Sequence, residues 1–215
     1  MWIVPVALVA LGLILFLVLR GGSGGGGILG RAQDDSIPRL RFRLSKVVPV
    51  PVTDAKPSEL EHAARPAASA VTKTITALYS EAFLDPGNWR GGSYDSVWTL
   101  FDDGSRSAAQ GEDQTLTLGP SAGDRYETVK QPKGKLSVKV LLDDKEQAAT
   151  AVAIVRFETV ATGKDGTLTT VVSTGQYFLH PGPDGWRIYS FSVGREDEEQ
   201  APQPGPSGSP SGGSS

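Results

Sequence analysis

The feature that most constrains this chain is an uncharged hydrophobic segment close to its N-terminus. Residues 2–19 read WIVPVALVALGLILFLVL, which is eighteen residues without a charged side chain. As a helix rising 1.5 Å per residue they would extend about 27 Å, close to the hydrocarbon thickness of a bilayer. Trp2 at the start and Arg20 just after the end suit the two membrane interfaces. The segment predicts one transmembrane helix over residues 1–20, with a cleaved signal peptide and a buried core helix as the alternatives.

Positive charges follow this segment and do not precede it. Arg20, Arg31 and Arg39 are the first of them. The positive-inside rule counts Lys and Arg near the ends of a membrane helix, so it favours a cytoplasmic position for the chain that follows. We therefore expect a single-pass protein of the cell membrane with a cytoplasmic soluble domain. An extracytoplasmic domain is the alternative.

Both ends of the chain differ in composition from its middle. Residues 21–30 are nearly all Gly and Ser, which is typical of a flexible linker, and we expect a linker over residues 21–57. Residues 196–215 begin with acidic residues, end in Pro, Gly and Ser, and are predicted to be a disordered tail. The foldable part, residues 58–195, has the size of one domain.

Within the predicted linker, apolar and basic residues alternate between positions 39 and 44, and Pro49 and Pro51 follow. A period of two is that of a strand, so an edge strand docked on the domain is one interpretation. A second is a basic segment attracted to anionic lipid, and a third is a solvated linker. The candidate lipid-facing side chains are Arg39, Arg41, Arg43 and Lys46.

Helices are predicted at the start of the foldable part. Ser58 and Glu61 have the spacing of a capping box, and the apolar residues that follow recur at helical spacing until the sequence Asp85-Pro86-Gly87-Asn88. A second, short helix is predicted from apolar residues at positions 94, 97, 98 and 101. We expect Ser93 to cap its start, and Asp102-Asp103-Gly104 to end it.

Beyond Gly111 the hydrophobic period becomes two. Strands are predicted over residues 136–142, 150–160, 168–179 and 186–193, joined by short polar turns that contain Gly. Such turns connect antiparallel hairpins. Helices followed by a meander of strands predict an α+β fold in which the helices cover one face of a curved antiparallel sheet.

This order of elements resembles the NTF2-like (cystatin-like α+β) superfamily. The resemblance rests on Asp184-Gly185-Trp186-Arg187-Ile188 in the last strand, on the helix end from Tyr79 to Phe83 and on Trp98, and it covers about residues 67–193. The superfamily includes bacterial membrane-anchored members, among them Mce-associated and Tim44-like proteins. The resemblance implies a cone-shaped pocket between helices and sheet, and a homodimer through the sheet face.

The residues expected to line such a pocket are hydroxyl-bearing or apolar. Ser173 and Tyr177 share one face of the strand over 168–179, and Ser190 and Tyr189 represent the two faces of the next strand. A lining of this kind suits a neutral ligand or a protein surface. The candidate pocket residues are Tyr79, Trp98, Ser173, Tyr177, Tyr189 and Ser190.

Several kinds of chemistry have no support in the sequence. The chain has no cysteine, which excludes disulfides, thiolate catalysis and Cys-ligated zinc. Its two histidines, His62 and His180, are expected to be separate surface residues, so we predict no metal and no cofactor. The net charge of −3 gives no electrostatic support for a nucleic-acid partner.

The sequence therefore favours a non-catalytic, membrane-tethered module that binds a partner protein or a small apolar ligand. One alternative is an isomerase or hydratase built on the same cone, which would need a buried Asp or His inside the pocket; Asp95 or Asp124 deep in the pocket, facing Tyr177 or Tyr189, would favour it. A second alternative is a sensor of anionic lipid that acts through the basic segment.

Overall fold

The computed structural model describes residues 37–52 and 56–200 of the 215-residue chain. The predicted membrane helix over residues 1–20, the Gly-rich segment over residues 21–30 and the tail from residue 201 lie outside the described residues. Among the described helices, none is long and apolar enough to cross a membrane.

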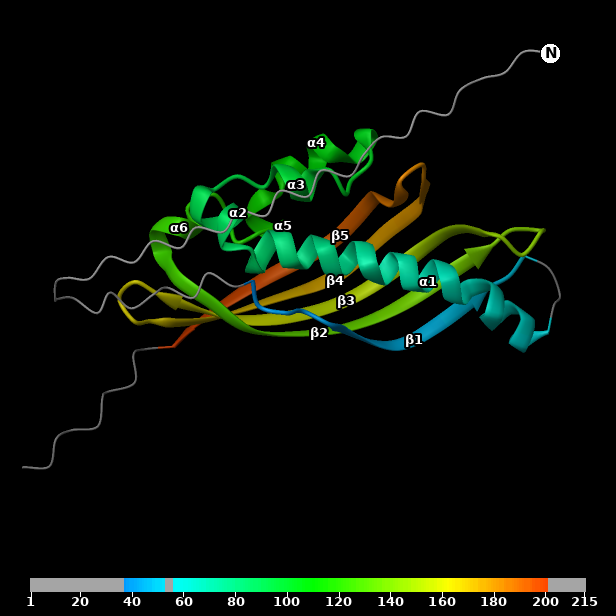
Figure 1. Cartoon of the computed structure of the whole chain (residues 1–215), viewed down its shortest axis with the longest axis horizontal. Helices are drawn as coiled ribbons and strands as arrows, with labels where there is room; N and C mark the ends of the chain where they lie inside the picture. The colour runs from blue at the N-terminus through cyan, green and yellow to red at the C-terminus, as the bar shows by residue number, and fades with distance from the viewer. Residues whose placement is uncertain (1–36, 53–55, 201–215) are drawn as a thin grey trace, which may run out of the picture. The chain divides into compact units, whose positions relative to one another are not determined.

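Five strands form one sheet whose spatial order follows the chain (Figure 1). β1 pairs with β2 in parallel, and every other neighbouring pair is antiparallel. The strands are β1 (Phe42–Val50), β2 (Tyr126–Leu142), β3 (Ala148–Gly163), β4 (Leu168–Gly182) and β5 (Gly185–Gln200).

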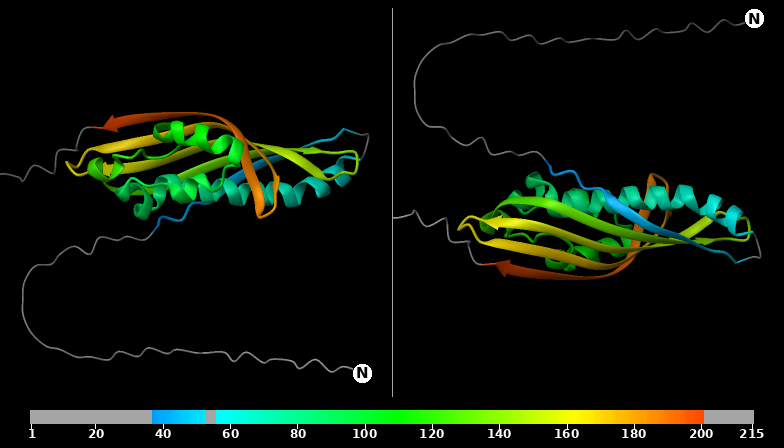
Figure 2. Two further views of the ribbon diagram at one scale, coloured as in Figure 1. Left: turned by 90° about the horizontal axis from the view of Figure 1, so that it is seen from above. Right: turned by 90° about the horizontal axis from the view of Figure 1, so that it is seen from below.

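The helices lie together on one side of this sheet, which leaves the opposite face of the strands without a helix among the described residues (Figures 1 and 2). The long helix α1 packs over β1, β2 and β3, while α4 and α5 contact β5. The expected α+β class is therefore confirmed. The helical elements are α1 (Pro57–Tyr79), the π-helical turn η1 (Ser80–Leu84), α2 (Pro86–Gly91), α3 (Asp95–Trp98), α4 (Asp103–Gly111), α5 (Asp113–Leu116) and α6 (Ala122–Arg125).

Helix α1 buries one face against the sheet. Its buried residues include Val71, Ile75 and Leu78, which recur at the spacing of a helical face. The expected capping box is wrong, because the helix begins earlier, with Lys56 as N-cap and Pro57 in its first turn. Proline suits that position, since its missing N–H would have no partner inside the helix.

Two aspartates that were expected to end helices also begin them. Asp85 follows the end of η1, as predicted, and starts α2, whereas α3 ends before Asp102, which starts α4. The Asp85 carboxylate accepts a hydrogen bond from the Gly87 N–H at the start of α2, and the Asp102 carboxylate accepts one from the Ser105 N–H at the start of α4, both at 2.8 Å. These bonds satisfy N–H groups that no helical carbonyl can reach. The second predicted helix is correspondingly shorter, because Phe101 leaves it to form a bridge with Ile188 of β5.

The edge strand β1 confirms one interpretation of the alternating basic segment. Leu40 and Phe42 are buried, whereas the four basic side chains Arg39, Arg41, Arg43 and Lys46 are exposed. Phe42 lies on Gly134 of β2, where an added Cβ would come within 2.5 Å of its ring. Pro49 is accommodated within this strand, as proline is at sheet edges.

The last strand continues into the segment that was predicted to be disordered. Residues 196–200 pair with residues 168–172 of β4. Arg195 forms a forked ion pair with Asp197, which holds one of the acidic side chains in place. The prediction of disorder is therefore wrong for residues 196–200. Their side chains have little apolar surface to bury, but backbone pairing and this ion pair hold the segment in the sheet.

Candidate functional site

Three of the predicted pocket residues meet in the interior between α1 and β4. Ser173 and Tyr177 lie on the face of β4 that points toward the helices, and Tyr79 lies at the end of α1. The Tyr177 hydroxyl donates to the Tyr79 hydroxyl at 3.2 Å, and the Tyr79 and Ser173 hydroxyls are 2.9 Å apart. We call these three residues the hydroxyl chain. Its members satisfy one another inside the core.

Burial determines the protonation of the two tyrosines in the hydroxyl chain. Desolvation raises the pKa of Tyr79, although its hydrogen bonds to Ser173 and Tyr177 oppose the shift. Burial also raises the pKa of Tyr177, and the neighbouring Tyr79 adds to the effect. Both phenols therefore stay neutral near pH 7, where they act as hydrogen-bond partners and not as bases.

Aromatic rings fill the space around the hydroxyl chain. The Tyr79 ring centroid lies 4.8 Å from that of Phe157, and 5.4 Å from those of Phe42 and Phe83. Among all the described residues, the other buried polar side chains also end in hydroxyl groups. Besides Ser173 and the tyrosines, they are Ser105, Thr117, Thr159 and Thr169.

The other predicted pocket residues lie elsewhere. Trp98 is buried at the end of α3 beside Phe101, with the ring centroids 6.1 Å apart. Tyr189 and Ser190 are exposed. A register shift between Phe178 and Leu179 inserts an extra residue into β5, so the strand changes face at Tyr189 and the expected alternation fails there.

Neither candidate carboxylate of the enzyme alternative is buried. Asp95 is exposed at the start of α3, where it accepts a hydrogen bond from the Ser93 hydroxyl at 2.9 Å. Asp124 is exposed in α6, at the rim of a surface hollow.

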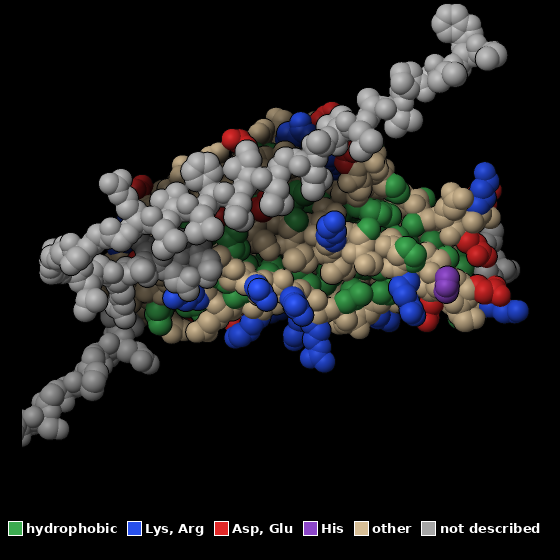
Figure 3. Space-filling view, in the orientation of Figure 1, with side chains coloured by type: hydrophobic (Ala, Val, Ile, Leu, Met, Phe, Trp, Pro, Cys, Tyr) green, Lys and Arg blue, Asp and Glu red, His purple; other side chains and the backbone are tan. Residues whose placement is uncertain are grey.

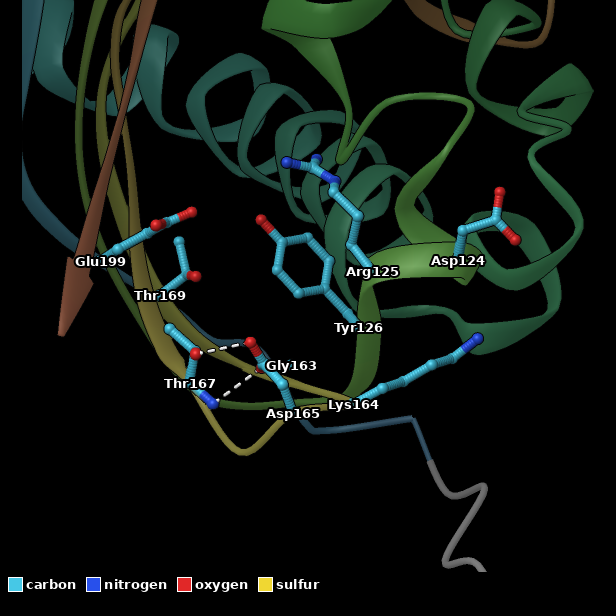
Figure 4. Close-up of a pocket in the computed structure, with 9 residues that line it drawn as sticks. All are labelled: Asp124, Arg125, Tyr126, Gly163, Lys164, Asp165, Thr167, Thr169 and Glu199. Atoms are coloured by element: carbon cyan, nitrogen blue, oxygen red, sulfur yellow. Dashed lines mark hydrogen bonds between the residues drawn. The ribbon is translucent and has the colours of Figure 1, made fainter. Parts of the chain in front are cut away.

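That hollow, of about 340 Å³, opens where the β3–β4 hairpin meets α6 (Figure 4). Arg125 lies over the ring of Tyr126, with its guanidinium carbon 4.8 Å from the ring centroid. Asp165 accepts hydrogen bonds from the backbone and the side chain of Thr167, which lower the pKa of the carboxyl group. These bonds are those of a hairpin turn. Acidic and basic side chains both line the hollow, so its charge does not select one kind of ligand.

One contact between titratable groups was not predicted. His180 Nε2 lies 3.3 Å from Asp102 Oδ2, whereas His62 is exposed on α1. Partial desolvation raises the pKa of Asp102, but hydrogen bonds from Ser105 and His180 outweigh it and hold this pKa below its usual value. Since the two residues are 78 positions apart, no local pattern indicates the contact. Among the described residues, no group of three or more acidic or histidine side chains is arranged to hold a metal ion.

The face of the sheet opposite the helices carries an apolar patch, which we define as Val152, Ile154, Phe178 and Tyr189. Val152 pairs with Phe178 across β3 and β4. The Tyr189 ring lies 6.3 Å from the Phe178 ring and 5.6 Å from the His180 ring. Tyr189 is 41% exposed, and Val152, Ile154 and Phe178 are half-buried.

Comparison of the chain with family models, curated proteins and solved structures gives no match.

Proposed function

We propose that this protein is a non-catalytic binding module, held at a membrane by the predicted N-terminal helix, that binds a partner protein through the open face of its sheet. The observation that carries the proposal is the contrast between the two faces. The inner face is filled by the hydroxyl chain and its aromatic neighbours, whereas the outer face bears the apolar patch.

The contents of the interior support a binding role over catalysis. General acid–base catalysis requires a titratable group that can reach a substrate, with a pKa near the working pH. The titratable groups of the hydroxyl chain are tyrosines whose pKa values are raised by burial. Their hydroxyls already bond to one another and to Ser173.

The composition of the apolar patch supports a protein as the partner. Aromatic residues such as Tyr and Phe are enriched in the central part of protein interfaces. The Tyr189 hydroxyl lies 3.4 Å from the Thr150 hydroxyl, which orients the ring while leaving one side of it open. The NTF2-like resemblance, which implies pairing through the sheet face, is compatible with this choice and remains a prediction.

Site-specific photocrosslinking tests the proposal in native membranes. The full-length chain would carry benzoylphenylalanine in place of Phe178 or, as a control, in place of the exposed Ser107 on α4. We expect a discrete protein adduct from position 178 that is absent from position 107. Adding Tyr189→Arg should abolish the adduct, whereas Tyr177→Phe should not.

The proposal fails if position 178 gives no protein adduct, or if both positions give the same adducts. An adduct with the mass of two copies of the chain would identify the partner as a second copy. Fractionation of the same cells tests the tether, since we expect the full-length chain in the membrane pellet even after washing with alkaline carbonate.

A further inference from the structure

The outer face also carries a row of positive charges that is not visible as a unit in the sequence. Arg43 of β1 pairs with Lys135 of β2, which pairs with Arg156 of β3. All three side chains are exposed. Adjacent strands are about 4.8 Å apart, so these cations stand next to one another on three neighbouring strands. We call Arg43, Lys135 and Arg156 the basic row.

Further basic side chains flank the row. Lys46 of β1 pairs with Ser137, and Lys139 lies two residues farther along β2 on the same face. In Figure 3, Lys and Arg side chains project along the lower edge of the molecule, where β1 and β2 lie in Figure 1. The nearby Lys133 differs from these residues, because it forms an ion pair with Glu158 at 3.3 Å.

No such partner exists for the basic row within residues 37–52 and 56–200. None of its three members forms an ion pair with any carboxylate in that part of the chain. The acidic side chains Glu196 and Glu198 lie on β5, at the opposite edge of the sheet from β1. Like charges opposite one another on neighbouring strands destabilise a sheet, so an anionic ligand would relieve a repulsion that the fold leaves in place.

We infer that the basic row binds the headgroups of anionic phospholipids and lays this edge of the sheet on the membrane surface. The inference rests on the membrane tether of the proposed function. β1 is the first described strand after the predicted membrane helix. The residues between 19 and 42 can span at most about 75 Å, so the basic row is confined to the neighbourhood of the bilayer.

A planar array of cations suits a planar array of phosphates. Each Lys or Arg near an anionic surface strengthens its binding by about five-fold, and the attraction decays within a Debye length of about 8 Å. Three cations on adjacent strands can approach the surface together. Two members of the apolar patch, Phe178 and Tyr189, lie on β4 and β5, farther from this edge of the sheet than the row, where a partner protein could still reach them.

The absence of cysteine from the chain makes the orientation of the sheet measurable. Thr174→Cys places a single thiol at an exposed position of β4, opposite Arg156 of β3. Ser107→Cys places one on α4 as a control. Each full-length variant would be reconstituted into nanodiscs of phosphatidylcholine, with or without phosphatidylglycerol. The measurement is the rate at which a charged maleimide labels the thiol.

We expect labelling at position 174 to be several-fold slower in the anionic nanodiscs than in the neutral ones, with high salt removing the difference. Position 107 should label equally in both. Replacing the basic row (Arg43→Gln, Lys135→Gln and Arg156→Gln) should remove the protection. Replacing three exposed basic residues outside it (Arg65→Gln, Lys73→Gln and Lys145→Gln) removes the same charge and should preserve it.

Three results would overturn the inference. The first is equal labelling of position 174 in the two lipids, and the second is equal loss of protection in both triple variants. The third is protection that rises with the number of protein copies per nanodisc and not with anionic lipid, which would show that a second copy covers the face. Failure of the chain to enter nanodiscs at all would instead reject the tether of the proposed function.

Discussion

At the scale of single residues, the hydroxyl chain is an ordered series in which the members have unequal importance. Tyr79 is its centre, because it bonds to both Ser173 and Tyr177, whereas each of the other two bonds to Tyr79 alone. Removing a buried hydroxyl lowers the free energy of unfolding most when it leaves other polar groups without hydrogen-bond partners.

Replacing Tyr79 by Phe should therefore destabilise the fold more than replacing Tyr177 by Phe. The first substitution leaves two hydroxyls unpaired and should cost about 2–4 kcal/mol, while the second removes an end of the chain and should cost about 1 kcal/mol. Urea unfolding of the two variants measures the difference. Equal losses, or the reverse order, would contradict the role assigned to Tyr79.

The raised pKa of the Tyr94 phenol predicts that the folded protein becomes less stable in alkali. Burial raises the pKa of its phenol to about 12, against 10.0 for a free tyrosine. Between these pH values the folded state keeps a proton that the unfolded state has lost, so the free energy of unfolding falls as pH rises. The stability that this residue contributes is complete below pH 10 and decreases by up to about 1.4 kcal/mol per pH unit above it.

Urea unfolding between pH 8 and pH 11 checks this expectation, with Tyr94→Phe as the reference. The variant loses the hydrogen bond from the Tyr94 hydroxyl to the Gly119 carbonyl, so it should be less stable at pH 8. The gap should narrow as pH rises above 10. A gap that stays constant over this range would show that Tyr94 does not keep its proton in the folded state.

At the scale of elements, the attachment of β1 depends on close contact between Phe42 and Gly134. An added Cβ at Gly134 would lie 2.5 Å from the Phe42 ring, so Gly134→Ala should displace the ring and loosen the strand. We expect a loss of about 1–3 kcal/mol, as for other overpacked core positions. Gly194→Ala is the matched control, because an added Cβ there meets nothing within 4 Å.

Both variants can be compared by urea unfolding and by amide hydrogen exchange of β1. Gly194→Ala should change stability by less than about 0.5 kcal/mol. Faster exchange confined to β1 and its partner residues in Gly134→Ala would locate the damage. If the two variants behaved alike, the Phe42 contact would not be what holds the strand.

At the scale of the whole molecule, the sheet begins before the boundary expected from composition. A fragment of residues 58–200 lacks β1, and with it the buried side chains of Leu40 and Phe42. It would also leave the edge of β2 unpaired. We expect a fragment of residues 37–200 to unfold cooperatively, and the shorter fragment to aggregate or to melt at least about 10 °C lower.

Thermal unfolding followed by circular dichroism distinguishes the two fragments. Equal melting temperatures would mean that β1 adds nothing to the folded unit, and would make the boundary at residue 58 the correct one.

The local patterns of the sequence determined the elements whose periodicity is long and uninterrupted. The apolar face of α1, the three antiparallel hairpin pairings and the α+β class all follow from spacing of 3.6 or 2 and from polar turns. The alternation around Phe42 gave an edge strand as one of three interpretations, because burial of one face and solvation of the other leave a period of two.

The tertiary structure alone decided which residues meet across long separations. The shift beside Phe178 leaves both Tyr189 and Ser190 exposed, although strict alternation would place one of them inside. It cannot be seen in a strand read by itself, because a bulge is a property of two paired strands. The contact between Asp102 and His180 and the basic row likewise join residues from distant segments. Each depends on strand register, which backbone pairing and packing set together and which no local pattern of residue types records.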